Sequence, residues 1–529
     1  MWAAAWQGHA LTSPARWLDA NIFHPTPLAL AYGPMRIGFL PFFLPTFLPT
    51  SNPLLAHNVA FLLVVSLSAW TMHITLRWWT GSDLAGFLAA WTLLTTRWVL
   101  WGFAATNPHY AALPYFPLIV LAVATPCGWL ARAAPLALLL VLQGLTDLYL
   151  AVALFVPLGG LAAIRLLRSS SRPAAVRLIL VLAVAVTLVA VAHGGHLLVR
   201  LANPELAMQS PWQSHRIPAE QGALWDLLGL RYFMYDGPDE VPLASLLLIA
   251  AGGASFLWRP RIADGTLRQA WRHGVFWVLA GLLLGLPPRL PVGGELVDLP
   301  TAWLPFHQVA RNTFRLRTAT LMGLSILTGL GAAELMRRLT ADRVGTSTRW
   351  LAAVAMTAIA AAAMYGDLTT RWGRPGALCT PAAVCRPLPA SYPLAKPPRL
   401  PSPAMLEMLR RPGGALLELP IGTGNGRPWV HAHAMYRSIF HWKPLANGYA
   451  SYWPADFTAR MSTAKALPAA EAVQRLRREI GLDMILLSHD RLSDTERRIW
   501  ATPAVLRAAG LRVLSRDDSF TLLAVRLGD

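Results

Sequence analysis

Charged residues are scarce in this sequence of 529 residues, since only 14% are Asp, Glu, Lys or Arg whereas 55% are hydrophobic. A soluble body of this size needs more polar side chains to cover its surface. The mean hydropathy of +0.42 agrees with this conclusion. The composition therefore excludes a soluble globular protein and predicts a polytopic membrane protein.

Acidic residues are fewer than basic ones, 27 against 46, which gives a net charge of +19. In a soluble chain such an excess would suggest nucleic acid as the partner. Here the arginines lie mostly in short loops between apolar runs, where they orient membrane spans and contact anionic lipid head groups. We therefore expect membrane lipids as partners and no nucleic acid.

Cysteine is also rare, and three residues are too few for a disulfide scaffold. Cys379 and Cys385 flank a short turn that contains proline, and the sequence leaves open whether they form a disulfide or stay unrelated thiols. The sequence contains no Walker loop, GxGxxG after a strand, HExxH or nucleophile elbow, which excludes nucleotide hydrolysis. It predicts no metal site and leaves a divalent cation open as a cofactor.

Long apolar runs fill the first two thirds of the chain. Because a bilayer core requires about 20 apolar residues per helix, the sequence predicts about ten spans. They are 54–78, 84–103, 111–130, 133–148, 149–167, 175–199, 241–258, 272–288, 317–337 and 349–367. This predicts a mostly α fold, with a transmembrane helical domain over 54–367.

Arginines gather in three of the connections, at 165–177, 259–272 and 337–349. If these loops face the cytoplasm, then 1–53, 200–240, 289–316 and everything after about 368 face the other side. For a bacterium this predicts a multi-pass protein of the inner membrane, with a periplasmic or extracellular C-terminal domain. The chain opens on a Trp- and Pro-rich segment without a signal peptide, so we expect a further helix before Met1 in the native protein.

The C-terminal third has the composition of a tether followed by a soluble module. Residues 368–412 are rich in proline. Within 413–529, the segments 414–421, 482–489, 511–517 and 520–527 have the pattern of strands, and 469–480 and 493–509 have helical spacing. We predict a small extracytoplasmic α/β domain over 413–529, with 1–53 as the first extracytoplasmic loop.

Three arginines, Arg311, Arg315 and Arg317, stand where the predicted span 317–337 begins. The N-terminus of a helix carries unpaired N–H groups and partial positive charge, so guanidinium groups there favour an anion. At membrane depth a lipid phosphate or pyrophosphate is the expected anion. Alternatively, the arginines reach to head groups or pair with Glu295 and Asp298.

Two candidate catalytic residues, Asp19 and His24, lie in the first outer segment, as a base and a hydrogen-bond donor or ligand. A plain loop-capping role for Asp19 is the alternative. His109 precedes a span in "NPHYAALPYFP" and is a candidate substrate-binding residue, or a satisfied structural group. In "LQGLTDLY", Asp147 would require a partner if buried, or would be solvated at a helix tip.

The segment 203–240 combines carboxylates with aromatic residues, among them Trp212, Asp226 and Tyr232. Aromatic faces stack on the C–H surfaces of sugars and carboxylates bind their hydroxyl groups, so these three residues are candidate substrate contacts. Trp and Tyr are also common anchors at membrane interfaces, which is the alternative. The stretch "HWKPLANGYASYWP" (441–454) suits either an acceptor cleft or a seam where the soluble domain packs on the membrane part.

Together these segments resemble a family of bacterial membrane proteins related to the C-type-fold glycosyltransferases, which use polyprenyl-phosphate-linked sugars. The resemblance extends over nearly the whole chain and rests on "ANIFHPTPLAL", "NPLLAHN", "RWWTGSDLAGFLAAW", the His and Pro residues of 109–117, "LQGLTDLY", "ELPI" and "HWKPLANGYASYWP". "FRLRTAT" is similar to the family's Phe-Arg-x-Pro-x-Arg at the start of a span, with Leu316 in place of proline. The resemblance implies a catalytic acid in the first outer loop, and this chain begins inside that loop.

The sequence thus predicts inverting transfer of a sugar from a polyprenyl-phosphate donor to an envelope glycan, lipid or protein acceptor of unknown identity. A non-catalytic protein of envelope polysaccharide assembly, or a membrane scaffold, is the alternative. A proton-coupled transporter is disfavoured because acids are nearly absent from the middle of the spans.

Overall fold

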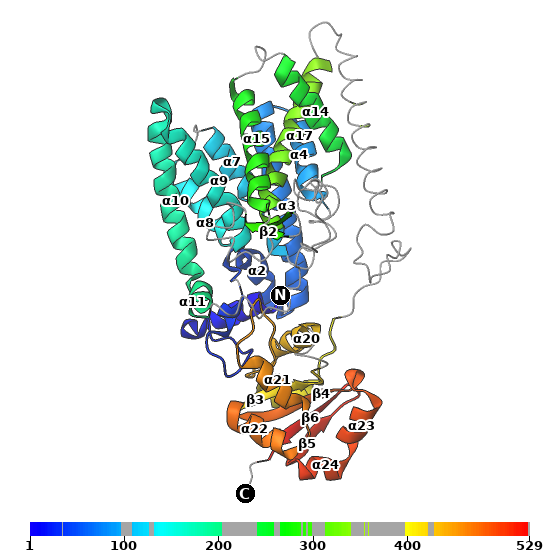
Figure 1. The fold of residues 1–529 in the computed structure, drawn as a ribbon. Coiled ribbons are helices and arrows are strands. Elements are labelled where there is room, and N and C mark those ends of the chain that lie inside the picture. Colours follow the sequence, from blue (N-terminus) through cyan, green and yellow to red (C-terminus); the bar gives the residue numbers. More distant parts are fainter. Residues whose placement is uncertain are drawn as a thin grey trace.

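The computed structural model describes residues 1–33, 35–96, 108–125, 132–203, 241–258, 265–286, 289–292, 295–298, 313–339, 354, 358, 397–421 and 428–526. An elongated helical bundle forms one part of the molecule, and a smaller domain with a mixed sheet lies at one end of it (Figure 1). The N-terminal segment lies between the two parts.

Nine helices build the described part of the bundle: α3 (Pro53–Thr80), α4 (Asp83–Leu94), α7 (Phe116–Ala124), α8 (Ala133–Gly144), α9 (Leu148–Leu166), α10 (Arg172–Ala192), α14 (Leu243–Trp258), α15 (Gly265–Gly285) and α17 (Thr318–Leu339). Local signals set their ends. Asn52 caps α3 by accepting from the N–H groups of Leu54 and Leu55, and Pro53 occupies the first helical turn. The helix α3 ends at Gly81, whose φ of 67° favours glycine.

The centre of the bundle is α17, which packs against α4, α14 and α15. Glycines permit this close approach. A Cβ on Gly281 of α15 would lie 2.2 Å from the backbone nitrogen of Thr320, and one on Gly331 would lie 2.1 Å from the carbonyl oxygen of Leu248. Small residues at such crossings are typical of helices that pack within a membrane.

Four helices in the described ranges are long and apolar enough to cross a membrane: Pro53–Thr80, Leu148–Leu166, Ser169–Ala192 and Arg315–Arg338. Shorter apolar helices occupy Ile37–Thr50, Asp83–Leu94, Ala133–Gly144 and Leu243–Ala254. The structure thus supports a multi-pass membrane protein, with fewer full-length spans among these residues than the ten predicted. Two of the predicted spans, 84–103 and 111–130, extend beyond the described residues, and 349–367 lies almost entirely outside them.

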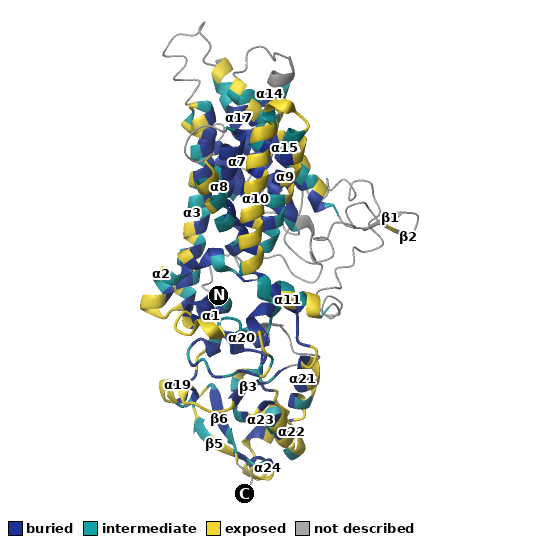
Figure 2. Ribbon diagram, turned by 90° about the vertical axis from the view of Figure 1, so that its left-hand side faces the viewer, coloured by how far each residue is buried: buried dark blue, intermediate teal, exposed yellow. Residues whose placement is uncertain are grey.

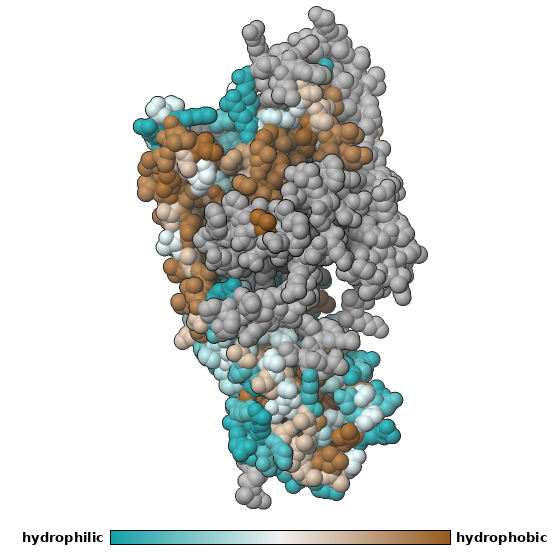
Figure 3. Space-filling view, viewed as in Figure 1, coloured by the Kyte–Doolittle hydropathy of each residue, from teal (hydrophilic) through white to brown (hydrophobic). Residues whose placement is uncertain are grey.

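The helix α10 shows how the bundle meets its surroundings. Its outward side chains are apolar and largely exposed. The exposed fraction is 63% for Leu180, 50% for Leu188 and 73% for Val191. Figure 3 shows apolar side chains along this side of the bundle and hydrophilic ones over the C-terminal domain. In Figure 2, exposed residues also run the length of α10. An exposed apolar stripe of this kind fits a lipid-facing surface.

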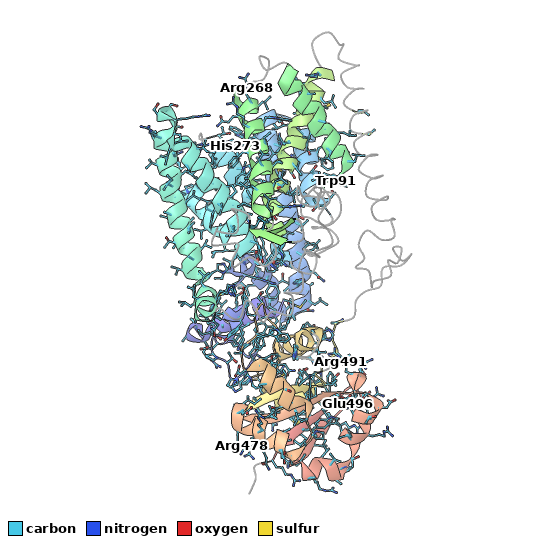
Figure 4. The ribbon with its side chains drawn as sticks, viewed as in Figure 1. Trp91, Arg268, His273, Arg478, Arg491 and Glu496 are labelled. Carbon is cyan, nitrogen blue, oxygen red and sulfur yellow. The ribbon has the colours of Figure 1, made fainter. Side chains whose placement is uncertain are left out.

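Basic residues mark the end of the bundle that lies away from the C-terminal domain. Figure 4 labels Arg268, near the start of α15, at this end. The ends of α9 and α17 and the start of α10 add further cations, which are Arg165, Arg168, Arg172, Arg177, Arg337 and Arg338. The described parts of the three expected basic loops therefore lie at one end of the bundle.

Helices also occur where the sequence predicted a first extracytoplasmic loop over 1–53. They are α1 (Trp2–Ala10), η1 (Pro14–Arg16), η2 (Ala29–Tyr32), η3 (Ile37–Phe39) and α2 (Leu40–Thr50). Trp2 and Trp6 are buried and stack on each other at 6.5 Å between ring centroids. The predicted span 175–199 likewise divides into α10 and a short helix α11 (Gly194–Ala202) near this segment (Figure 1).

The C-terminal domain contains a four-stranded sheet in the order β3-β4-β6-β5. The strands are β3 (Ala415–Leu419), β4 (Leu482–Ser488), β5 (Leu511–Arg516) and β6 (Phe520–Val525), at the four predicted positions. The strand β3 pairs parallel to β4, while β6 pairs antiparallel to both β4 and β5. The helices are α19 (Pro403–Arg410), α20 (Pro428–Ser438), α21 (Phe457–Lys465), α22 (Ala470–Ile480), α23 (Asp494–Ala501) and α24 (Pro503–Ala508). The predicted helix 493–509 is two helices, since Pro503 starts a new one.

A seam joins the N-terminal segment to the C-terminal domain. The backbone N–H groups of Phe23 and His24 donate to the carbonyl oxygens of Asn447 and Leu445, at 3.1 and 3.0 Å. In return the N–H of Leu445 donates to the carbonyl oxygen of Asn21 at 2.6 Å. Residues 445 and 447 of the stretch 441–454 thus belong to this seam, and a role of the stretch as an acceptor cleft stays a prediction.

Candidate functional site

Polar residues gather at the end of the bundle that faces the N-terminal segment. Two short helices lie there, η4 (Pro108–Tyr110) and η9 (Thr313–Arg317), together with the turn between α8 and α9. Gln143 ties two of these parts together, because its Nε2 donates to the carbonyl oxygen of Ala112 at 2.8 Å. The N–H of Tyr115 donates to Oε1 of the same side chain at 3.3 Å. This amide fixes the segment after η4 against the α8–α9 turn.

These ties bring His109 and Asp147 together. Nε2 of His109 lies 3.6 Å from Oδ2 of Asp147, and each side chain is only 1% exposed. Oδ1 of Asp147 caps α9 by accepting from the N–H of Tyr149 at 2.7 Å. The structure thus buries Asp147 and places His109 beside it, without a hydrogen bond between the two side chains.

Neither ring nitrogen of His109 has a hydrogen-bond partner in the described part of the chain, and Oδ2 of Asp147 has none either. Burial and the charges of Arg36 and Arg315 hold the pKa of His109 well below its usual range. The imidazole is therefore neutral in this state.

Arg315 lies between two tyrosine rings. Its Nη1 donates to the hydroxyl oxygen of Tyr110 at 2.5 Å, and its guanidinium carbon lies 5.0 Å from the centre of that ring. The ring of Tyr149 is 4.9 Å away from the same carbon. Stacking of this kind holds a guanidinium plane in one orientation.

Arg317 is buried beside Gly285, with 3% of its surface exposed. A Cβ on Gly285 would lie 2.5 Å from Cγ of Arg317, so only glycine leaves room for this arginine. The two predicted donor residues, Arg315 and Arg317, therefore lie on η9 at the outer end of α17. The third, Arg311, lies outside the described residues.

The sequence did not identify Arg36 as a site residue. It precedes η3, and η3 is fixed on the α8–α9 turn because the N–H of Gly38 donates to the carbonyl oxygen of Leu145 at 2.9 Å. Arg36 is close enough to Asp147, Arg315 and Tyr449 for their charges to act on its pKa. A lone arginine in the apolar run "GPMRIGFLPFFLP" was the only sequence signal.

Cationic side chains gather near the buried Asp147. The charges of Arg36 and Arg315 act on this carboxyl group, and Arg317 lies on the same short helix as Arg315. Guanidinium groups placed in this way favour an anion such as a phosphate. We call Arg36, His109, Asp147, Arg315 and Arg317 the outer cluster.

The predicted catalytic pair lies elsewhere. Oδ1 of Asp19 accepts from the N–H of Leu28 at 2.8 Å, which is the loop-capping role left open by the sequence. The carbonyl oxygen of His24 accepts from Nη1 of Arg460 at 2.8 Å, so this residue belongs to the seam. Burial, followed by the charge of Arg460, lowers the pKa of His24. Among the described residues no hydrogen bond or ion pair joins Asp19 to His24, since their contacts are those of the turn and the seam.

The remaining candidates stay predictions. Trp212, Asp226 and Tyr232 lie outside the described residues. Within the described ranges, no group of three or more His, Cys, Asp or Glu side chains is placed to hold a metal ion. Asp19 does line a cavity of about 370 Å³ with Leu18, Met35 and Val191.

Comparison with known proteins gives only distant similarity. No family model and no curated protein matches the chain. Among solved structures, the chain is similar to the crystal structure of ArnT from Cupriavidus metallidurans bound to undecaprenyl phosphate. The two sequences are 13% identical, the match covers 99% of this chain and 93% of that chain, and the TM-score is 0.42. The apo state of the same ArnT gives 13% identity, 99% and 92% coverage, and a TM-score of 0.36. These scores are too low to establish a common fold.

Proposed function

We propose that this chain is an integral membrane glycosyltransferase-like protein, which transfers a sugar from a polyprenyl-phosphate donor to an acceptor of the cell envelope. The observation that carries the proposal is the outer cluster, where Arg36 and Arg315 flank a buried acid at the end of an apolar bundle. A lipid-linked phosphate has its hydrocarbon chain in the bilayer and its charged group at the depth of the outer cluster. The resemblance of the sequence to polyprenyl-phosphate-dependent enzymes supports the same donor class.

The proposed topology follows from the two ends of the bundle. One end carries the cations of the loops between spans, and Figure 4 shows Arg268 there, far from the C-terminal domain. Basic loops stay in the cytoplasm. This supports an inner-membrane protein of a bacterium, with the outer cluster, 1–53 and 413–529 on the extracytoplasmic side, and with 368–412 as the tether.

In the proposed reaction a hydroxyl oxygen of the acceptor bonds to the anomeric carbon of the donor sugar. The bond from that carbon to the phosphate oxygen breaks, and its electron pair leaves with the lipid phosphate. The phosphate then carries a second negative charge. Arg36, Arg315 and Arg317 stabilise this charge, which develops during the step and is therefore stabilised more in the transition state than in the ground state.

The direct test replaces Arg315 with Ala and with Lys in the full chain, reconstituted in nanodiscs. Consumption of undecaprenyl-phosphate-linked hexoses and amino sugars is measured, together with binding of undecaprenyl phosphate. We expect Arg315→Ala to lower turnover about 10²–10³-fold, and Arg315→Lys to retain only part of it because lysine cannot stack or bind bidentately.

The matched control is Arg168→Ala, an exposed arginine at the opposite end of the bundle, which should leave turnover unchanged. Turnover that is equal in wild type and Arg315→Ala would remove the donor-site assignment. A wild-type chain that binds the lipid phosphate and never transfers sugar would favour the alternative, a non-catalytic envelope assembly or scaffold protein.

A further inference from the structure

His109 and Asp147 are buried side by side without a hydrogen bond between them. Buried polar atoms in native proteins nearly always have hydrogen-bond partners, and leaving one without a partner costs about 1–3 kcal/mol. Within the described residues, both ring nitrogens of His109 and Oδ2 of Asp147 lack such a partner. The two side chains are nevertheless held 3.6 Å apart by elements that are themselves well bonded.

The geometry gives the two residues different roles. Oδ1 of Asp147 is fixed by the start of α9, so Oδ2 faces Nε2 of His109. At 3.6 Å the two atoms make no hydrogen bond, but the negative charge of a carboxylate in this position favours the tautomer with its N–H at Nε2, which leaves the lone pair at Nδ1. Nδ1 is buried and has no hydrogen-bond partner among the described residues. An acid that orients a histidine base is a recurring arrangement in group-transfer enzymes.

The charges around His109 suit a base at neutral pH. Arg36, Arg315, His57 and the amino group of Met1 act on it from neighbouring elements, together with the carboxylate of Asp147. The hydroxyl of Tyr110 and the ring of Tyr149 both contact Arg315 in this cluster. Burial and then the cations keep the ring neutral at rest, and a leaving phosphate would offset the cations as its second negative charge develops. The step that releases the proton of the acceptor hydroxyl therefore also produces the negative phosphate charge that stabilises an imidazolium.

We infer that His109 is the general base of the proposed transfer and that Asp147 is its positioning residue. The inference rests on the proposed function. As the acceptor oxygen bonds to the anomeric carbon, its proton moves to Nδ1 of His109, while the electron pair of the breaking carbon–oxygen bond stays with the lipid phosphate. Asp147 fixes the tautomer and stabilises the imidazolium. This assignment replaces Asp19, whose carboxylate caps a turn.

The first test measures turnover against pH for the full chain in nanodiscs, with the same panel of undecaprenyl-phosphate-linked sugars. His109→Gln should lower kcat about 10²–10⁴-fold, with the KM for donor changed less than about threefold. Asp147→Asn should lower kcat about 10–100-fold and move the acid limb of the pH profile about one unit lower, because a base without its carboxylate is protonated only at lower pH. Added imidazole should restore part of the turnover of His109→Ala.

The matched control is His193→Gln. His193 is also fully buried, neither of its ring nitrogens has a hydrogen-bond partner in the described ranges, and it lies at the end of α10 on the same side of the bundle. This variant should retain the wild-type pH profile. If His109→Gln and Asp147→Asn retain it as well, or only raise the KM, the pair has a structural role and the inference is wrong.

A second measurement does not depend on turnover. Calorimetry in two buffers of different ionisation enthalpy gives the protons taken up when undecaprenyl phosphate binds at pH 7.5. The wild type should take up more protons than His109→Gln, because the bound phosphate offsets the arginines around the ring. Binding with equal proton uptake in both would overturn the role of His109 while leaving the donor site intact. A wild type that neither binds the lipid phosphate nor transfers sugar refutes the proposed function and this inference together.

Discussion

Each part of the molecule buries an acid beside a base, and the two pairs differ in how they are bonded. In the C-terminal domain, Nε and Nη2 of Arg437 donate to Oε2 of Glu418 at 2.9 and 2.5 Å, and the N–H of Glu418 itself donates to Asn447. At the bundle end, His109 and Asp147 approach only to 3.6 Å. The first pair uses its hydrogen bonds to join β3 to α20. No hydrogen bond joins the two residues of the second pair. Asp147 uses Oδ1 to cap α9, so Oδ2 and the two ring nitrogens of His109 are the atoms of this pair that are available for a ligand.

The largest expected effect is on stability, at Arg437. Arg437→Met leaves Glu418 buried without its cation, which should lower the free energy of unfolding by about 3–5 kcal/mol. Asp147→Asn should cost less than about 1 kcal/mol, because Asn still caps α9 and no hydrogen bond to His109 is lost. Chemical unfolding of the full chain in detergent measures both. If both variants lose the same free energy of unfolding, the two pairs do not differ in how much they stabilise the fold.

The next effect concerns the approach of Arg36 to the outer cluster. A Cβ on Gly38 would lie 2.6 Å from the backbone nitrogen of Thr146, and backbone atoms there cannot move aside cheaply. Gly38→Ala should therefore cost about 1–3 kcal/mol of stability and displace Arg36. We expect affinity for undecaprenyl phosphate to fall about tenfold, measured by calorimetry, since one guanidinium contact is weakened.

The control for this substitution is Gly159→Ala in α9, where an added Cβ meets nothing within 4 Å. It should leave both affinity and stability near wild type. A Gly38→Ala protein that is destabilised but binds the lipid phosphate normally would show that Arg36 does not contribute to the anion site.

The smallest effect is a pH dependence in the C-terminal domain. Burial, with the charges of Lys443, Arg437 and Arg410, lowers the pKa of His441 from 6.5 to about 3. Since the unfolded state binds the proton first, stability is full above pH 6.5 and is lost as the pH falls toward 3, by about 1 kcal/mol at pH 5.5. His441→Asn has no titrating group and retains an acceptor for the N–H of Lys443, which now donates to Nδ1 at 3.0 Å. Thermal unfolding at pH 7.5 and 5.5 should show a smaller loss for this variant than for wild type.

The sequence predicted some parts of this structure and not others for identifiable reasons. The strands at 415–419 and 482–488 follow from compact apolar runs, and α3 and α9 from apolar length. Arg315 and His109 were identified because a cation or a histidine beside a span is conspicuous. Arg36 was missed because its position depends on the contact of Gly38 with Thr146, which joins segments far apart in the chain.

The burial of Asp147 also could not be decided from the sequence. Whether it was solvated or paired depended on the hydrogen bond from Gln143 to Ala112, which closes the α8–α9 turn onto the segment of His109. Asp19 and His24 were chosen as catalytic because an acid and a histidine lay near each other in the first segment. Instead, the seam with residues 445–447 fixes the backbone of His24, whose carbonyl oxygen also accepts from Arg460, and Asp19 caps a turn.

The seam also imposes an order of assembly. Ile22 and Phe23 are 1% and 0% exposed, and the backbone of residues 21–24 bonds to residues 445–447. During synthesis the ribosome must therefore complete the bundle and nearly all of the remaining chain before these early residues can be covered. Until then they form an exposed apolar edge that a chaperone or the bilayer surface must protect. Release of the C-terminal domain by proteolysis would expose the same edge again.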